Sequence, residues 1–241
     1  MTQHRDETAG RRSDVAELHL ASEEPEPLLR GDALAHDSLT DDADPEVLPV
    51  DRNQAILRAA KRTGALLKQT GHPFALAGSV AVYAHGGAQN LQHDVDFCIR
   101  PEDAEAVAEA LRAAGLLVRR PPEDWLLKAT CLGQQVDLIF ELAHQPVTTE
   151  LLGRAQNLSV DSVHMPVLAP TDLMRSLMAA FSEHHCDFGA VLPIARTLRE
   201  KIDWDDVRRT CAGSPMPDAF LYFLERLDVI PPQQPRQEAS R

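Results

Sequence analysis

Phe74-Ala-Leu-Ala-Gly-Ser-Val-Ala-Val-Tyr-Ala-His85 is the most informative stretch for the fold, because it places a short apolar run directly before a helical one. Residues 74–78 predict a buried β-strand, and residues 79–85 predict a short helix that ends at a pair of glycines. After a polar loop, Asp94-Val-Asp-Phe-Cys-Ile99 alternates polar and apolar positions, which predicts a second strand. A strand, a helix and a strand in this order indicate a domain that combines helices with a sheet.

The pattern continues on both sides of this stretch. Asp51 is a suitable N-cap for a helix that ends at Gly71. The other expected elements are a helix at 101–115, strands at 116–120, 125–132 and 135–142, a strand pair at 158–160 and 163–168, and helices at 172–181, 191–200, 205–211 and 217–227. We therefore expect an α+β fold, with a small mixed-sheet domain at residues 51–147 and a mainly helical C-terminal region at residues 148–230.

Most of the net charge lies at the N-terminal end of the chain. The 241 residues have a formal net charge of −13, and residues 1–50 carry 13 acidic and 4 basic side chains, a net charge of −9. This acidic segment has few large apolar residues, so we expect it to be a disordered tail. We also expect residues 231–241 to be a disordered tail. The remainder carries a net charge of only −4, so its overall charge gives no support for a basic nucleic-acid-binding surface.

The four cysteines, Cys98, Cys131, Cys186 and Cys211, lie in different segments and lack Cys-x-x-Cys spacing. This distribution argues against a structural zinc site and a disulfide framework, and it favours a reducing compartment. The sequence has no run of about 18 apolar residues and no signal-peptide pattern. We expect a soluble, cytoplasmic protein with no membrane partner.

Three aspartates are the candidate metal ligands. Asp94 and Asp96 are two residues apart on a predicted strand, so their carboxylates lie on one face. Asp137 interrupts the apolar run at 136–140, where an ionised group is costly without a partner. If the two strands are neighbours, three carboxylates meet and form a site for Mg²⁺ or Mn²⁺, which prefer oxygen ligands. Glu141 is an alternative third carboxylate, and the alternative for the Asp-x-Asp pair is a solvated strand edge.

The Gly78-Ser79 turn is the candidate phosphate site. A glycine allows the backbone to approach a phosphate, and a helix that begins at Ser79 directs free N–H groups toward an anion. The simpler alternative is an ordinary turn with an N-cap. Lys128, on the strand before Asp137, is a candidate phosphate-binding cation, although an exposed strand lysine is the commoner explanation.

Gly78-Ser79, Asp94-Val-Asp96-Phe97 and Val136-Asp137-Leu-Ile together resemble the signature of the DNA polymerase β-like nucleotidyltransferase superfamily. The wider context is similar to its bacterial minimal, toxin-type branch, which includes abortive-infection toxins. The motifs cover residues 74–140, and Ala169-Pro-Thr-Asp-Leu-Met and Glu183-His-His-Cys-Asp187 extend the resemblance more loosely. A metal site at 185–187 is the alternative for the last segment, and we favour a structural role or a substrate contact there.

The resemblance implies roles for individual residues. Asp94 and Asp96 would bind two metal ions, Asp137 would complete the catalytic metal site and help to deprotonate the attacking hydroxyl, and Gly78 and Ser79 would bind the triphosphate. Toxin-type relatives carry a nucleotide-binding lysine where this chain has Ser176. Arg175 is its candidate replacement, provided that the helix presents the neighbouring face, about 100° away.

The resemblance also implies an activity. The expected enzyme transfers a nucleoside monophosphate (NMP) from a nucleoside triphosphate (NTP), such as ATP, to an acceptor hydroxyl and releases pyrophosphate. The acceptor would be tRNA in a toxin–antitoxin system, or otherwise a protein or a small molecule, and a neighbouring gene would encode a partner protein. The basic cluster nearest to the site is Arg112, Arg119, Arg120 and Lys128. The alternatives are an inactive nucleotide-binding or antitoxin-like regulator, and an enzyme that hydrolyses the nucleotide.

Overall fold

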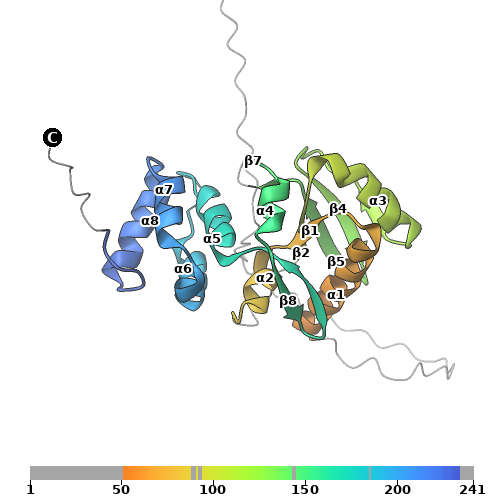
Figure 1. Ribbon diagram of the computed structural model, residues 1–241, viewed down its shortest axis with the longest axis horizontal. Coiled ribbons are helices and arrows are strands. Elements are labelled where there is room, and N and C mark those ends of the chain that lie inside the picture. Colours follow the sequence, from red (N-terminus) through yellow and green to blue (C-terminus); the bar gives the residue numbers. More distant parts are fainter. Residues whose placement is uncertain (1–50, 88–90, 92–93, 143–144, 185, 234–241) are drawn as a thin grey trace, which may run out of the picture.

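A computed structural model describes residues 51–87, 91, 94–142, 145–184 and 186–233. The tail expected at residues 1–50 and most of that expected at 231–241 lie outside these ranges. The described chain forms a mixed sheet with helices packed on it, followed by a group of helices beside the sheet (Figure 1). This arrangement confirms the expected α+β class.

The sheet has seven strands in the order β3-β4-β5-β2-β1-β9-β8. The strands are β1 (Phe74–Leu76), β2 (Asp94–Ile99), β3 (Leu117–Arg119), β4 (Leu126–Cys131), β5 (Gln134–Ile139), β8 (Gln156–Val160) and β9 (Val163–Val167). β2 runs parallel to β5 and β1 runs parallel to β9, whereas the other neighbours are antiparallel. The strands that carry Asp96 and Asp137 are therefore direct neighbours at the centre of the sheet.

Two helices cover one face of the sheet, and Val95 and Phe97 of β2 point toward this face. The helices are α1 (Arg52–Thr70) and α3 (Ala104–Ala113), the latter preceded by the 3-10 turn η1 (Pro101–Asp103). Asp51 caps α1 by accepting a hydrogen bond from the N–H of Asn53, and Gly71 ends it at φ 74°. α1 packs on β2, β4 and β5 and also contacts α3. Since strand side chains alternate between faces, Asp94 and Asp96 point away from these helices.

The sheet extends along the chain beyond residue 147, where we expected the mixed-sheet domain to end. After β6 (Glu141–Leu142) and β7 (Gln145–Pro146), which form a separate two-stranded sheet, the short helix α4 (Thr149–Gly153) leads into β8 and β9. β9 pairs with β1 through Leu76 and Val167, so residues up to 167 belong to the sheet. The helical region therefore begins at Pro170.

The C-terminal helices form a second hydrophobic core. They are α5 (Pro170–Ala179), α6 (Phe188–Leu198), the 3-10 turn η2 (Arg199–Lys201), α7 (Trp204–Cys211) and α8 (Pro215–Arg226). The aromatic rings of Phe181, Phe188, Phe220 and Phe223 contact one another in this core. Val82 of α2 (Gly78–Ala84) also belongs to it, so α2 connects the sheet to the helical region. None of the described helices has the length and apolar composition of a membrane-spanning segment.

Candidate active site

The pairing of β2 with β5 brings three carboxylates together. Asp96 lies directly opposite Asp137, and Asp94 lies opposite Gln135. One side-chain oxygen from each of the three aspartates lies within 4.8 Å of the others. The structure thus gathers into one cluster all three residues that the sequence singled out as metal ligands.

The carboxylate cluster is buried and electrostatically strained. Asp96 and Asp137 are each 7 % exposed, and Asp94 is half-buried. Burial, followed by the charges of Asp94 and Asp137, raises the pKa of Asp96 well above its ordinary value. A divalent cation among these oxygens would remove that repulsion, and carboxylate oxygens are the ligands that Mg²⁺ and Mn²⁺ prefer. The donor set therefore fits a divalent metal ion.

Gly78 lies against the carboxylate of Asp96. A Cβ atom at position 78 would lie 1.8 Å from Oδ2 of Asp96, and Gly78 has a positive φ of 60°. The N–H of Ala77 donates a hydrogen bond of 2.8 Å to the carbonyl oxygen of Asp96, which ties the turn to β2. α2 begins at Gly78, one residue earlier than expected, and Ser79 is half-buried beside it. Only glycine fits between the start of α2 and the carboxylates.

Lys128 lies beside the carboxylate cluster. It lies opposite Asp137 on the antiparallel strands β4 and β5, and its Nζ is 3.5 Å from Oδ2 of Asp137. Its charge lowers the pKa of Asp96, in opposition to the larger effect of burial. The structure places Lys128 beside the carboxylates, as the phosphate-binding hypothesis requires.

Glu141 is not part of the carboxylate cluster. β5 ends at Ile139, and Glu141 belongs to β6 in the separate two-stranded sheet. The N–H groups of Phe140 and Glu141 both donate to the carbonyl oxygen of Trp125, which turns the chain away from β5. The alternation that placed Glu141 on the same face as Asp137 does not continue past this bend, so that alternative is wrong.

Arg175 lies in an ion-pair network between two helices. Its guanidinium is 3.5 Å from Oδ1 of Asp172 on α5 and 3.4 Å from Oδ2 of Asp206 on α7. Ser176 is buried, and its hydroxyl donates to the carbonyl oxygen of Leu173 at 2.8 Å. Within the part of the chain that the structure describes, no ion pair joins Arg175 to the three carboxylates.

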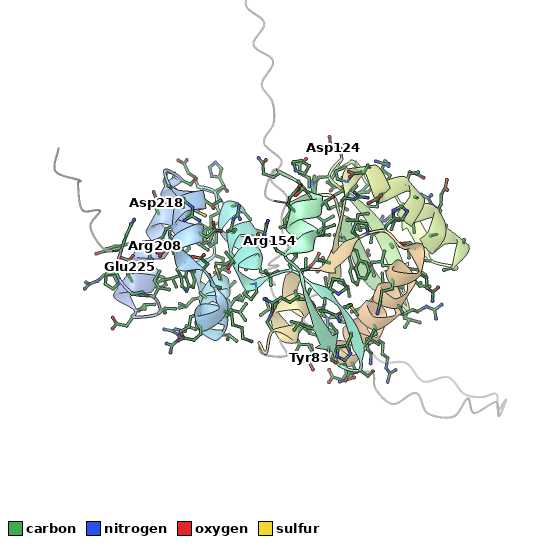
Figure 2. The ribbon with its side chains drawn as sticks, viewed as in Figure 1. Tyr83, Asp124, Arg154, Arg208, Asp218 and Glu225 are labelled. Atoms are coloured by element: carbon green, nitrogen blue, oxygen red, sulfur yellow. The ribbon has the colours of Figure 1, made fainter. Side chains whose placement is uncertain are left out.

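The sequence-based reasoning missed Arg154, which holds the sheet and the helical region together. Its guanidinium donates two hydrogen bonds to Asp172, Nε to Oδ2 at 2.9 Å and Nη2 to Oδ1 at 2.7 Å. Asp172 is buried, and Arg154 lies at the end of α4, between α4 and α5 (Figure 2). No local pattern marked Arg154, because α4 is a single short turn of helix and the partner lies 18 residues away. Of the two partners in this ion pair, only Asp172 lies in a segment that carries the family resemblance, Ala169-Pro-Thr-Asp-Leu-Met.

Three other residues from the sequence analysis have structural roles. His85 is the C-cap of α2, and its ring Nε2 also lies 2.8 Å from the carbonyl oxygen of Leu168. Burial lowers the pKa of His85, which favours a neutral ring whose Nε2–H donates this bond. Asp187 caps α6 by accepting a bond from the N–H of Ala190, whereas residue 185 lies outside the described residues. Burial raises the pKa of Cys98, which keeps this thiol beside Asp96 protonated.

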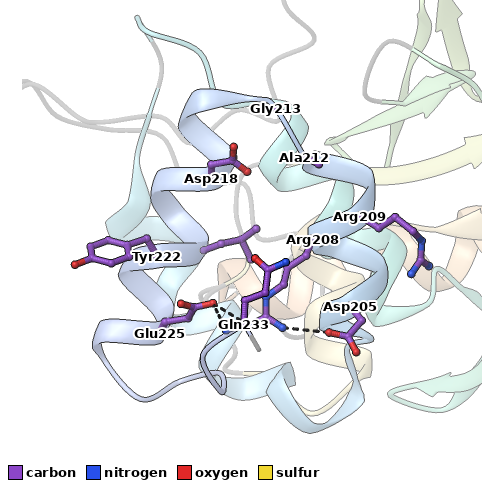
Figure 3. A pocket seen from close by; sticks show the side chains of 10 residues that line it. Asp205, Arg208, Arg209, Ala212, Gly213, Asp218, Tyr222, Glu225 and Gln233 are labelled. Carbon is purple, nitrogen blue, oxygen red and sulfur yellow. Dashed lines mark hydrogen bonds and ion pairs between the residues drawn. The ribbon is translucent and has the colours of Figure 1, made fainter. Parts of the chain in front are cut away.

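A surface pocket of about 580 Å³ lies in the helical region, away from the carboxylates (Figure 3). α7, α8 and Gln233 line it. Its central cation, Arg208, pairs with Glu225 at 3.1 Å and with Asp205 at 3.3 Å. Arg208 is thus already paired with carboxylates of the pocket, and none of the three clustered aspartates borders the pocket.

Comparisons with known proteins identify a sequence family and a related fold. Residues 48–228 match the sequence model of a family described as "uncharacterised nucleotidyltransferase". No curated protein matches the sequence. The fold resembles that of ANT(2")-Ia in complex with adenylyl-2"-tobramycin, with a TM-score of 0.50, 10 % identity, and coverage of 69 % of this chain and 97 % of that chain.

More distant similarities involve TM1012 from Thermotoga maritima and the Megavirus polyadenylate synthase. TM1012 has a TM-score of 0.41 and 20 % identity, over 62 % of this chain and 92 % of the other. The synthase has a TM-score of 0.40 and 14 % identity, over 71 % of this chain and 40 % of the synthase chain. The family match covers more than half of the chain and confirms the expected nucleotidyltransferase, whereas the toxin-type branch stays a prediction. The chain belongs to this nucleotidyltransferase family and is a nucleotidyl-transferring enzyme.

Proposed function

We propose that this enzyme uses Mg²⁺ or Mn²⁺ to transfer an NMP from an NTP, such as ATP, to an acceptor hydroxyl, with release of pyrophosphate. The observation that carries the proposal is the cluster of Asp94, Asp96 and Asp137 within 4.8 Å of one another. Asp94 and Asp96 would hold the metal ions, with Asp137 as the third ligand. A bound divalent ion supplies Lewis-acid stabilisation of the charge that develops on the phosphoryl oxygens.

The protein's own groups have complementary tasks in this reaction. Asp137 accepts the proton of the acceptor hydroxyl, for which its place in the cluster is suited. Gly78 lets the backbone at the start of α2 approach the triphosphate, and the Ser79 hydroxyl adds a hydrogen bond. Lys128, which is 3.5 Å from Asp137, contributes a positive charge to the same phosphates. Arg175 would reach the nucleotide only by leaving Asp172 or Asp206.

The acceptor is the finer part of the proposal. The resemblance to toxin-type enzymes favours the 3′ end of tRNA, and the compound bound to ANT(2")-Ia suggests tobramycin as a second acceptor to test. A toxin would also require a neighbouring antitoxin protein. Expression of the chain alone should then arrest growth, whereas the Asp94→Asn variant should not.

The activity can be tested directly. The purified protein is incubated with each α-labelled NTP and Mg²⁺, with total tRNA or with tobramycin, and label on the acceptor and free pyrophosphate are measured. We expect transfer by the wild type, a loss of at least about 100-fold for Asp94→Asn and Asp137→Asn, and no loss for Glu141→Gln, since Glu141 lies outside the cluster. Transfer by Asp94→Asn at the wild-type rate would refute the metal site.

The second candidate function is that of an inactive nucleotide-binding regulator. Its support is Ser176, which is buried and hydrogen-bonded at the position where toxin-type relatives would place a lysine. Calorimetry separates the two functions: binding of Mg-NTP without pyrophosphate release, over every acceptor tried, would favour the regulator.

A further inference from the structure

The carboxylate cluster continues as a row of charges toward the edge of the sheet. Arg119 on β3 lies opposite Lys128 on β4, Lys128 lies opposite Asp137 on β5, and Asp137 lies opposite Asp96 on β2. Directly opposed residues on neighbouring strands project from the same face. Two cations and two carboxylates therefore lie in one line across four strands, and β3 is the outermost strand at that end.

A second line of residues runs beside this row on the same face. Leu117 lies opposite Thr130, Thr130 opposite Gln135, and Gln135 opposite Asp94. Leu117 is 77 % exposed, and Thr130 and Gln135 are exposed as well. The helices α1 and α3 pack on the opposite face. We call the set Leu117, Arg119, Thr130 and Gln135 the edge patch.

Arg119 differs from the two arginines near it in sequence. Arg112 and Arg120 both pair with Glu105, at 3.1 Å and 3.5 Å. Arg119 is exposed and makes no such ion pair with any residue in the ranges that the structure covers. Arg120 follows the end of β3, and its partner Glu105 belongs to α3 on the opposite face of the sheet, so Arg120 is directed away from the edge patch. Arg119 is thus a cation on the carboxylate face with no protein anion assigned to it.

The sheet order places the edge patch and the Gly78 turn on opposite sides of the carboxylates. The strands run β3-β4-β5-β2-β1, so Lys128 and Arg119 lie beyond Asp137, whereas Gly78 lies against Asp96. In phosphoryl transfer the attacking and leaving oxygens lie on opposite sides of the phosphorus. If the triphosphate lies at Gly78 and Ser79, as the proposed function has it, the acceptor must approach from the edge patch.

We infer that the edge patch binds the acceptor and that this acceptor is itself a nucleotide. Arg119 provides charge for a phosphate group of the acceptor, and Leu117, two residues from Arg119 on the same face, provides an apolar contact for a base. The hydroxyl of such a nucleotide would lie next to Asp137, which takes its proton as the oxygen attacks the α-phosphate of the NTP and pyrophosphate leaves. This inference rests on the proposed function, and it narrows the acceptor to an RNA 3′ end or a free nucleotide.

Binding to a labelled RNA tests the inference. A 5′-fluorescein RNA of about eight nucleotides that ends in CCA is titrated with the full chain in Mg²⁺ and followed by anisotropy at several salt concentrations. We expect Arg119→Ala to raise Kd about tenfold and to lower the salt slope by about 0.7. Arg120→Ala, the matched control on the other face, should change Kd less than about twofold. Leu117→Ala should raise Kd about threefold, through loss of base contact.

Further measurements separate the outcomes. Direct binding of free AMP or CMP, measured by calorimetry and lost in Arg119→Ala, in the absence of RNA binding would support the patch and identify a free nucleotide as the acceptor. The inference is overturned if the wild type binds neither RNA nor free nucleotide, or if Arg119→Ala and Arg120→Ala bind alike. Calorimetry with Mg-NTP tests the proposed function independently of the acceptor. Arg119→Ala should bind Mg-NTP with the same affinity as the wild type. Absence of Mg-NTP binding by the wild type would refute the proposed function, even if RNA binding required Arg119.

Discussion

Gly78 and Asp96 are in such close contact that no side chain fits between them: a Cβ atom at position 78 would lie 1.8 Å from Oδ2 of Asp96. Gly78 also has a φ of 60°, which L side chains rarely adopt. The turn between β1 and α2 and the clustered carboxylates are therefore one packed unit. A change in the turn should move the carboxylate, because Ala77 and Asp96 are both buried.

The first prediction concerns this contact. Gly78→Ala should lower transfer activity at least about 100-fold, because a displacement of about 1 Å at a reacting centre costs that much. It should also reduce the free energy of unfolding by more than about 1 kcal/mol, through the clash and the positive φ. Pyrophosphate release and urea unfolding measure the two effects.

Gly71→Ala is the matched control for this prediction. Gly71 has a similar φ of 74°, but a Cβ atom at this position would have no neighbour within 4 Å. This variant should lose about 1 kcal/mol of stability, through the helix C-terminus alone, and keep full activity. Equal activity of Gly78→Ala and Gly71→Ala would contradict the packing argument.

The second prediction separates stability from activity at Asp96. Burial and two neighbouring carboxylates raise the pKa of Asp96, so its ionised form destabilises the metal-free protein. Asp96→Asn should raise the free energy of unfolding in EDTA by on the order of 1 kcal/mol and abolish activity. Thermal unfolding in EDTA measures the gain, and Asp124→Asn, at an exposed site, should leave both properties unchanged. Destabilisation by Asp96→Asn would show that the carboxylate is not under strain.

The third prediction is that metal binding releases protons. Because the pKa of Asp96 is raised in the folded state, the folded protein holds a proton that the unfolded protein loses at about pH 3.9. The stability of the metal-free protein should therefore fall as the pH rises from this value through the raised pKa of Asp96. A divalent ion binds the ionised form, so its affinity should fall as the pH is lowered through that pKa.

Calorimetric titration with Mg²⁺ in buffers of different ionisation enthalpy measures this proton release. The apparent binding enthalpy should depend on the buffer at a pH near the raised pKa, and this dependence should disappear in Asp96→Asn. An apparent enthalpy that is the same in all buffers, across the pH range from about 4 to 8, would rule out a raised pKa at Asp96.

The fourth prediction concerns the ion pair between the two parts of the chain. Arg154 makes two short hydrogen bonds to the buried carboxylate of Asp172. Arg154→Met should destabilise the protein by about 2 kcal/mol, because the buried charge loses its main partner. Arg199→Met removes an exposed pair with Glu200 and should cost less than about 0.5 kcal/mol. Urea unfolding of both variants tests this, and equal losses would show that burial adds nothing to the Arg154 pair.

Local sequence signals were sufficient to specify the elements around the site. The helix from residue 52 to 70 formed as expected because Asp51 and Gly71 act within one turn of its ends. The strand of Asp94 and Asp96 was recognisable from its alternation, and Asp137 from its apolar neighbours. Each of these signals depends on residues only a few positions apart, so no knowledge of the fold was needed to read it.

Which of these residues face one another depends on the tertiary structure. The parallel register of β2 and β5 sets Asp96 opposite Asp137, and the pairing of β4 and β3 places Lys128 and then Arg119 in line with them. The bond between Arg154 and Asp172 and the entry of β8 and β9 into the sheet depend likewise on partners far along the chain. A strand pattern with period two specifies a face but not a neighbour, so the sequence determined the ligand types and the fold determined their assembly into one site.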